Sequence, residues 1–207
     1  VLYDGSPFFP DRKQMWNLAE KLEISIFGTS AKYIDACRKD KIFPSTFSNL
    51  SKLRMILSTG SPLIEESFEY IYEHVKKDVH LASISGGTDI ISCFALGSPT
   101  LEVAKGELQC RGLGMDVHSY DENGKPIIGN KGELVCISAF PSMPVYFWND
   151  SNGLKYEDAY FSTFSGVWHH GDFIRISESG SLKIYGRSDS TLNPGGARLG
   201  TAEIYAV

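Results

Sequence analysis

The chain has 207 residues, of which 42% are hydrophobic and 22% are charged, and its formal net charge is −5. This length suits one large domain or two small ones, with enough apolar residues for a buried core. The negative charge gives no long-range attraction to nucleic acid or to anionic lipid, so any contact with a phosphate must be local. No apolar run approaches the ~18 residues of a membrane span, and no signal peptide is visible.

The four cysteines lie far apart in the sequence and form no C-x-x-C pair. This spacing argues against a zinc ribbon and against a disulfide framework. Buried, reduced thiols are the simpler interpretation, and they favour a cytoplasmic protein. The cysteines are Cys37, Cys93, Cys110 and Cys136.

Residues 10–23 are predicted to form a helix, because their apolar positions recur at the spacing i, i+3, i+4, i+7. A short apolar run, residues 24–28, follows directly. Thr29 or Ser30 can then cap a second helix that runs through Cys37, since a hydroxyl accepts a backbone N–H that the first turn leaves unpaired. The apolar positions of the first helix are Met15, Leu18, Ala19 and Leu22.

The following segments repeat this alternation. Residues 53–60 have the pattern of a buried strand, and Ser61-Pro62 is predicted to open a helix. Residues 79–85 are predicted to form a further strand that runs into Gly86-Gly87. Alternation of this kind predicts an α/β fold, in which helices cover the faces of a parallel sheet. The apolar stripe of the helix after Pro62 consists of Ile64, Phe68, Ile71 and Val75.

From about residue 103 the pattern changes to strands. Asn123-Gly124 between two extended runs predicts a hairpin, because both turn positions can take a positive φ. A second hairpin is expected to turn at Ser179-Gly180. Residues 141–168 are rich in aromatic side chains and are predicted to be irregular. The coarse expectation is an α/β half followed by a small antiparallel β half.

Two strand ends in the α/β half carry residues that suit a ligand. In an open parallel sheet, ligands bind beyond the carboxyl ends of the strands. Residues 58–62 (STGSP) combine a glycine with an expected helix N-terminus, which favours an anion. Residues 85–89 (SGGTD) add a hydroxyl for a phosphate and a carboxylate for Mg²⁺. Each segment alone can be a structural turn, but together they outline one strand-end cleft.

The β half adds further polar groups. Asp172, in the segment HHGDFIRI, stands where a carboxylate can accept two ribose hydroxyls. The two preceding histidines invite a metal interpretation, but adjacent strand residues point to opposite faces, so we do not expect zinc. The guanidinium of Arg187 suits a phosphate, and the alternative is a surface salt bridge with Asp189. Ile184 is a core position by periodicity.

Several motifs together carry a resemblance to a known family. They are VLYDGSP, STGSP, SGGTDI, AYFSTF, HHGDF and, most specific, GRSDSTLNPGGARLGTAEIY. Across nearly its whole length the chain resembles the adenylate-forming superfamily of acyl-CoA synthetases, and most of all the members that act on acetoacetate. The resemblance implies part of the large N-terminal domain of that fold, namely a parallel sheet with helices followed by a small antiparallel β-barrel-like subdomain.

The resemblance also implies a nucleotide site. Residues after the first strand end would line the adenine, Thr88 would bind the α-phosphate, and Asp89 would take the Mg²⁺ position, where glutamate is commoner. Asp172 would hold the ribose hydroxyls, Ile184 would pack on adenine, and Arg187 would reach ribose and phosphate. The implied nucleotide-binding residues are Gly60, Ser61, Pro62, Ser85, Gly87, Thr88, Asp172, Ile184 and Arg187.

Roles at the end of the chain follow from the same resemblance. Gly196 would lie along the pantetheine of CoA, Arg198 near the phosphate, and Asp189 at the interdomain hinge. Thr88 and Arg198 are the expected catalytic residues. The implied divisions are an α/β sheet subdomain over residues 1–102, an antiparallel β subdomain over 103–188, and a hinge with the start of a C-terminal domain over 189–207.

We therefore expect an inner segment of a larger enzyme. The chain contains neither the family's Ser/Thr/Gly-rich phosphate loop nor its catalytic lysine, so the segment alone is not expected to be a competent ligase. Residues 190–207 are expected to pack poorly on the rest of the chain, because their few apolar side chains cannot form a core alone. Two other hypotheses remain: a nucleotide-binding module without turnover, and a folded segment without ligand affinity.

The implied reaction uses ATP, CoA and Mg²⁺ to convert an acid first into an acyl-adenylate and then into an acyl-CoA. Acetoacetate is the expected acid, with a medium-chain fatty acid as the alternative; no nucleic-acid partner is expected. The implied acyl pocket contains Thr29, Thr59 and Gly86. Where acetyl-CoA synthetases carry tryptophan, Gly86 would leave volume open, and the hydroxyl of Thr59 would bond a ketone. The alternative is that Gly86 is a turn residue with a positive φ.

Overall fold

The structure is a computed structural model, and it describes residues 1–189. By contacts the chain divides into two compact units. The first unit contains Val1–Ser83 and Val103–Gly106, and the second contains Ile84–Glu102 and the described residues from Glu107 onward. The domain boundaries expected from the sequence remain predictions.

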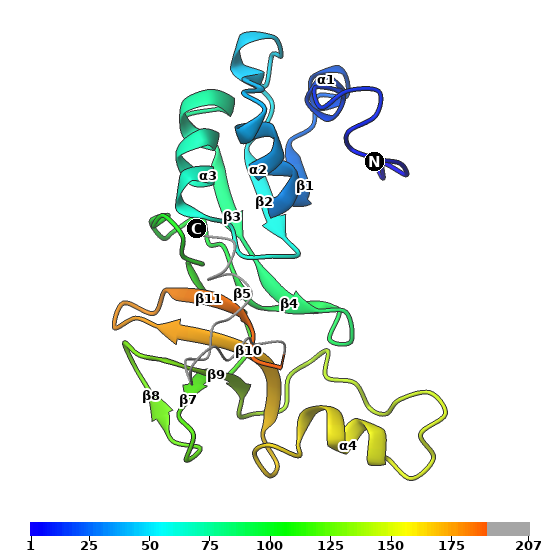
Figure 1. Cartoon of the computed structure of the whole chain (residues 1–207), viewed down its shortest axis with the longest axis vertical. Helices are drawn as coiled ribbons and strands as arrows, with labels where there is room; N and C mark the ends of the chain where they lie inside the picture. The colour runs from blue at the N-terminus through cyan, green and yellow to red at the C-terminus, as the bar shows by residue number, and fades with distance from the viewer. Residues whose placement is uncertain (190–207) are drawn as a thin grey trace, which may run out of the picture. The chain divides into compact units, whose positions relative to one another are not determined.

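The first unit is built on a parallel sheet of three strands in the order β1-β2-β3 (Figure 1). Helices alternate with these strands along the chain, so the predicted α/β alternation with a parallel sheet is confirmed. The elements are α1 (Gln14–Lys21), β1 (Ile26–Ser30), α2 (Ala31–Lys39), the 3₁₀ turn η1 (Pro44–Thr46), β2 (Met55–Thr59), α3 (Glu65–Tyr70), the π-helical turn η2 (Ile71–Val75) and β3 (His80–Ser83).

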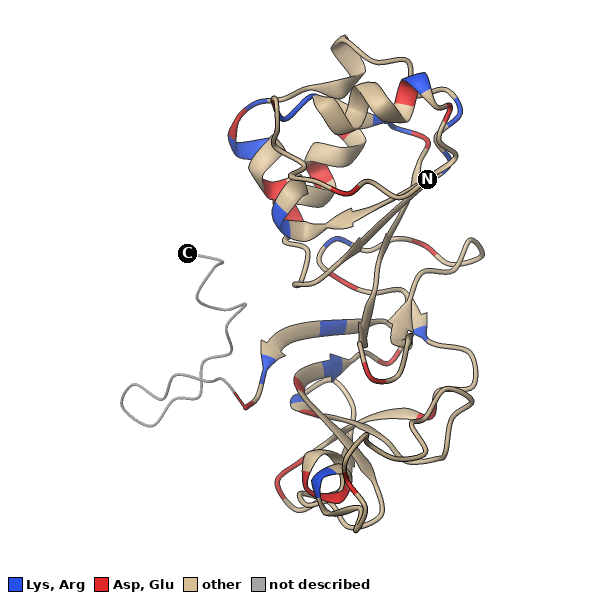
Figure 2. Ribbon diagram, turned by 90° about the vertical axis from the view of Figure 1, so that its right-hand side faces the viewer, with Lys and Arg blue, Asp and Glu red and all other residues tan. Residues whose placement is uncertain are grey.

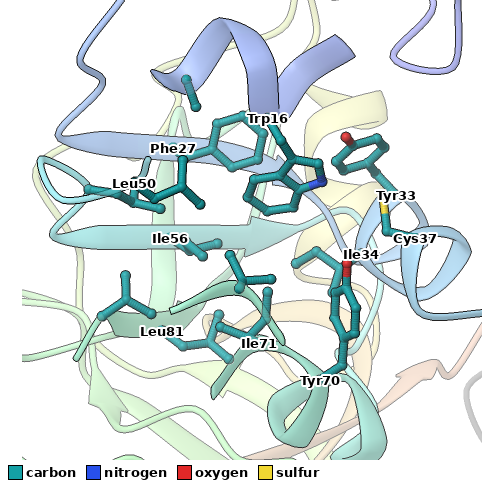
Figure 3. Close-up of a cluster of buried hydrophobic side chains, with 14 of the residues drawn as sticks. Trp16, Phe27, Tyr33, Ile34, Cys37, Leu50, Ile56, Tyr70, Ile71 and Leu81 are labelled. Carbon is teal, nitrogen blue, oxygen red and sulfur yellow. The ribbon is translucent and has the colours of Figure 1, made fainter. Parts of the chain in front are cut away.

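An aromatic cluster forms the core of this unit (Figure 3). The Trp16 ring, from α1, is fully buried and lies 4.9 Å from the ring of Phe27 in β1 and 6.0 Å from that of Tyr33 in α2. Ile56 of β2 and Leu81 of β3 are also fully buried. Each buried side chain of this size contributes roughly 1.5–3 kcal/mol, so the cluster joins helices and strands that are distant in sequence.

The helix boundaries agree with the sequence at one place and differ at another. Ser30 caps α2, and its Oγ accepts a hydrogen bond from the Tyr33 backbone N–H at 3.2 Å. The third helix, however, begins at Glu65 and not at Ser61-Pro62. Its first turn carries Glu65 and Glu66, which already complement the positive end of the helix dipole. The expectation of an anion-binding helix N-terminus directly after Gly60 is therefore wrong.

The described part of the second unit contains two antiparallel sheets and one helix (Figure 1). One sheet has three strands in the order β4-β5-β6, and the other has five in the order β11-β10-β9-β7-β8. Among the described strands neither sheet closes on itself, which corrects the barrel-like expectation. The elements are β4 (Ser85–Gly87), β5 (Ser92–Leu96), β6 (Cys110–Arg111), β7 (Val117–Tyr120), β8 (Pro126–Ile127), β9 (Lys131–Cys136), α4 (Leu154–Tyr160), β10 (Trp168–Ile176) and β11 (Leu182–Arg187).

Both predicted hairpins are confirmed, since β7 pairs with β8 and β10 pairs with β11. The first turn differs in detail. Gly124 has a φ of +72°, but Asn123 is not among the residues with positive φ. Instead, the Asp121 carboxylate accepts the backbone N–H groups of Asn123 at 2.9 Å and Lys125 at 2.8 Å. A side-chain hydrogen bond therefore stabilises the turn.

Charged side chains and cysteines are distributed over the described residues as follows. Figure 2 shows residues of both signs along the described ribbon, although α3 carries acidic side chains and no basic one. All four cysteines are free thiols, and two of them, Cys37 and Cys136, are buried. The helices that the structure describes are all too short or too polar to cross a membrane. Within residues 1–189 no group of three metal-ligating side chains comes together.

Candidate active site

Two of the expected ligand-binding residues of the first unit lie at the carboxyl ends of its parallel strands. Strands β1 and β2 are parallel, with Thr29 opposite Ser58 and Ser30 opposite Thr59. Thr29 and Thr59 therefore lie at the carboxyl ends of neighbouring strands, where ligands of open parallel sheets bind. Thr59 is exposed, and residues 60–62 continue directly from it as irregular backbone.

In the second unit, β4 begins at Ser85 and carries Gly86 and Gly87, and the turn after it exposes Thr88 and Asp89. Gly86 is packed against the backbone of β5. A Cβ at this position would lie 2.9 Å from the Cys93 Cα and closer still to the Ser92 carbonyl oxygen. Its φ is not positive. The close approach of β5 therefore explains the glycine, and the interpretation as a positive-φ turn residue is wrong.

Asp172 lies in a bulge of β10. On one side of this strand, His169 pairs with Val135 and Phe173 pairs with Glu133. The step from one pair to the next is therefore four residues along β10 but only two along β9. Such bulges bend a strand and redirect side chains. On the other side, Asp172 lies opposite Arg187 of β11.

Gly171 permits this arrangement. It has a φ of +77°, which favours glycine, and a Cβ there would lie 2.9 Å from Nη2 of Arg187. The glycine in the HHGDF motif therefore allows the guanidinium of Arg187 to approach the bulge of β10 closely.

The Asp172 carboxyl is only 8% exposed. Burial raises its pKa to about 6, although the nearby Arg187 guanidinium acts in the opposite direction. His170, equally buried, has its pKa lowered to about 4 by burial and by the same guanidinium. At neutral pH the pair is therefore an ionised carboxylate beside a neutral imidazole, with the two groups 3.6 Å apart.

The Arg187 side chain has several acceptors within its own unit. Its Nε donates to Asp189 Oδ1 at 3.0 Å and its Nη2 donates to Asp189 Oδ2, so the carboxylate is held by both arms. Its Nη1 donates to the His170 carbonyl oxygen at 3.1 Å. The salt bridge with Asp189 is thus present, and it also orients the guanidinium beside Asp172.

Aromatic residues connect Asp89 with the bulge. The Tyr160 hydroxyl donates to Asp89 Oδ2, and burial together with this carboxylate raises the pKa of Tyr160, which keeps the hydroxyl a donor. The Tyr160 ring stacks on Trp168 with centroids 3.6 Å apart. The Trp168 indole N–H in turn donates to His170 Nδ1 at 3.5 Å. Residues from the turn after β4, from α4 and from β10 therefore form one continuous cluster.

The chain matches no family model. It does match curated proteins along its length. It is 57% identical over 204 residues to an acetoacetyl-coenzyme A synthetase from Rhizobium meliloti (strain 1021), which covers 99% of this chain and 31% of that protein. It is 51% identical over 208 residues to an acetoacetyl-CoA synthetase from Gallus gallus, with 100% and 31% covered.

A solved structure agrees with these matches. The acetoacetyl-CoA synthetase from Streptomyces lividans superimposes with a TM-score of 0.90 at 48% identity, over 100% of this chain and 32% of that one. The chain corresponds to a segment of acetoacetyl-CoA synthetases. It spans about 31% of the length of the curated relatives. The anthranilate CoA ligase AuaEII, at 20% identity and a TM-score of 0.81 over 99% of this chain and 37% of that one, shares the fold.

In this segment, the expected site residues fall into two sets. Thr29, Thr59, Gly60, Ser61 and Pro62 lie in the first unit. The second unit holds Ser85, Gly86, Gly87, Thr88, Asp89, Asp172, Ile184, Arg187 and Asp189.

Ile184 is 9% exposed and belongs to the apolar core of the second unit, as its periodicity predicted. The expected roles of Gly196 and Arg198, and the expected poor packing of residues 190–207, lie outside the described residues.

The sequence did not single out two members of the cluster in this acetoacetyl-CoA synthetase segment. Tyr160 belongs to an aromatic-rich stretch in which no single ring stands out, and its contact with Asp89 spans 71 positions. For His170 the sequence raises only a metal-binding role, which the alternation of strand side chains disfavours. Its position two residues before Asp172 was the available signal, because a bulge brings such neighbours together.

Proposed function

We propose that this chain supplies nucleotide-binding and acyl-binding residues to an ATP-dependent ligase that joins acetoacetate to CoA. In the proposed reaction, the carboxylate attacks the α-phosphate of ATP to give an acyl-adenylate and diphosphate, and the CoA thiolate then displaces AMP. The observation that carries the proposal is the match to acetoacetyl-CoA synthetases, at 57% and 51% identity, over essentially the whole chain. Because the chain spans about 31% of these relatives, the activity is proposed for the full-length enzyme and not for the segment alone.

Asp172 is the proposed ribose ligand. Its buried carboxylate has two acceptor oxygens, and hydrogen bonds from two ribose hydroxyls would favour the ionised form that burial disfavours. Arg187, held beside it by Asp189, would donate to the ribose and a phosphate. Ile184 would contact the adenine, and Gly60, Ser61 and Pro62 are proposed as adenine-binding residues as well.

Asp89 and Thr88 are the proposed phosphate-side residues. Mg²⁺ typically binds one or two protein carboxylates together with substrate phosphates, and the exposed Asp89 carboxylate fits this pattern. The ion would neutralise charge on the phosphates. The Thr88 hydroxyl would donate to the α-phosphate, Arg198 would add a positive charge there, and Gly196 would line the CoA path.

For the acid, we propose acetoacetate, bound near Thr29, Thr59 and Gly86. A threonine hydroxyl can donate to a ketone oxygen, and a site that makes such a bond discriminates strongly against acids without the ketone. The exposed Thr59 at the end of β2 has a side chain of the required kind. A medium-chain fatty acid remains the alternative, and the cytoplasm is the proposed location.

The proposal is tested by Asp172→Ala in the full-length enzyme. Loss of charge-assisted hydrogen bonds worth about 1.5–3 kcal/mol should raise the KM for ATP by roughly 10- to 100-fold, with a smaller effect on the KM for acetoacetate. Asp158→Ala, which removes an exposed carboxylate from α4, is the matched control. An unchanged KM for ATP in the Asp172 variant would remove this residue from the ribose site.

A further inference from the structure

The imidazole of His170 is held on several sides within the second unit. Its ring meets the Phe94 ring edge-on, with centroids 4.7 Å apart. The Trp168 indole lies on another side. A Cβ at Gly87 would lie 2.8 Å from His170 Cε1, so the lack of a side chain at Gly87 leaves room for the imidazole ring. His170 therefore has little rotational freedom.

These contacts also fix the position of the ring proton. An indole N–H can only donate, so His170 Nδ1 must accept the hydrogen bond from Trp168. The proton of the neutral ring then lies on Nε2. This nitrogen is 3.6 Å from Asp172 Oδ2. The Gly86 backbone raises the pKa of His170 through a hydrogen bond, so it is a second acceptor for the ring N–H. The imidazole thus presents a donor toward the carboxylate without adding a charge.

The neighbouring histidine does not share this arrangement. His169 Nε2 lies 2.9 Å from Glu133 Oε2, and its ring packs edge-on against Phe164. Of the two adjacent histidines, only His170 is directed at Asp172, and its own carbonyl oxygen accepts from Arg187. His170 therefore contacts the carboxylate and the guanidinium that we propose as ribose ligands.

We propose that His170 is a positioning residue that orients the Asp172 carboxylate toward the ribose of ATP through its Nε2–H. The inference rests on the proposed role of Asp172. The bulge leaves this carboxylate outside the regular pairing of β9 and β10, so backbone pairing alone does not fix its orientation. The separation of 3.6 Å is longer than a hydrogen bond, and hydrogen bonds of empty sites are often long and tighten only when the ligand binds.

The test measures ribose recognition directly. In the full-length enzyme, kcat/KM is determined for ATP and for 3′-deoxyATP with His170→Phe, which keeps a planar ring and removes the donor. The preference for ATP should fall about 3- to 10-fold, the worth of one hydrogen bond, with the change in KM and not in kcat. His170→Gln, whose amide can donate from a similar position, should recover most of the preference. His169→Phe is the matched control and should leave it unchanged.

Different outcomes contradict different parts of the argument. Equal losses for ATP and 3′-deoxyATP in His170→Phe would show a purely structural role and overturn the inference. If His170→Phe does not fold, His170→Asn is used instead, because its shorter side chain keeps an acceptor for Trp168 and withdraws the donor that faces Asp172. An unchanged preference for ATP over 3′-deoxyATP in that variant would also overturn the inference. Failure of the proposed function would instead appear in Asp172→Ala, as an unchanged KM for ATP.

Discussion

Replacing Asp172 by asparagine should make the chain more stable at neutral pH. Burial raises the pKa of this carboxyl from 3.8 to about 6. The folded chain therefore holds a proton between these pH values that the unfolded chain has released, and its stability falls as the pH rises through this window. Each pKa unit corresponds to about 1.4 kcal/mol, so the buried charge costs up to about 3 kcal/mol above pH 6. Asparagine has the same shape and removes that charge.

The comparison of variant with wild type isolates this effect. His170 has the opposite shift, since its pKa is lowered to about 4 and its contribution to stability is lost as the pH falls from 6.5 toward 4. Both proteins contain His170, so its contribution largely cancels in their difference. The free energy of unfolding is measured by urea titration of the 207-residue chain at several pH values, followed by tryptophan fluorescence.

The advantage of Asp172→Asn should be largest near pH 7 and should vanish as the pH approaches 3.8. Asp158→Asn, at an exposed position of α4, serves as the control and should change stability little. A variant that is no more stable than wild type at neutral pH, or one whose advantage persists in acid, would refute the reasoning. Functional residues often lower the stability of the folded chain in this way.

Two further predictions concern packing and capping in the second unit. Gly86→Ala should destabilise the chain by about 1–3 kcal/mol, because its Cβ meets the backbone of β5, whereas a Cβ at Gly28 meets nothing within 4 Å and Gly28→Ala should be nearly neutral. Urea titration of both variants checks this difference, and equal effects would contradict it. Asp150→Ala should cost about 0.5–2 kcal/mol, because the Asp150 carboxylate accepts the first-turn N–H groups of Lys155 at 3.1 Å and Tyr156 at 2.9 Å. The measurement is the loss of α4 protection in amide hydrogen exchange, with Asp158→Ala as the control; unchanged protection of Lys155 and Tyr156 would argue against the cap.

The Gly86 contact also changes how a larger substitution at this position can be interpreted. The resemblance implies that Gly86 leaves open a volume that tryptophan fills in acetyl-CoA synthetases, and on that basis a tryptophan here would be expected to favour acetate over acetoacetate. Since even a methyl group collides with the backbone of Ser92 and Cys93, Gly86→Trp should disturb β4 and lower activity toward both acids. Thr59, exposed at the end of β2, is the better position for a test of acid selection.

Local patterns predicted the elements whose contacts lie nearby in the sequence. Periodicity identified the three parallel strands, and the hydroxyl of Ser30 caps its helix as expected. The same periodicity predicted that Leu22 is a core residue, but its side chain is 44% exposed in the structure. It did not include Trp16, which is fully buried. The indole finds its partners on β1 and α2, and no local pattern indicates which turn of a short helix will face them.

The candidate site shows the same limit. Asp172 and Arg187 could be anticipated because each stands at a strand edge in a recognisable motif. Helix α4 was missed, because its first turn depends on a carboxylate outside the helix, that of Asp150. The contact between Tyr160 and Asp89 was missed because it requires α4 to be placed beside the turn after β4. The roles of such residues depend on tertiary packing and not on their immediate neighbours in sequence.

The bulge in β10 has a consequence for how related sequences are aligned. Pairing with β9 fixes His169, and pairing with both β9 and β11 fixes Phe173, so the number of residues between them is set by geometry as well as by chemistry. Removing one residue there would turn Ile174 and Ile176 outward and Arg175 inward, since successive strand residues face opposite ways. An alignment gap within residues 170–172 would therefore mark a different sheet, whereas a gap in the loop before α4 would not.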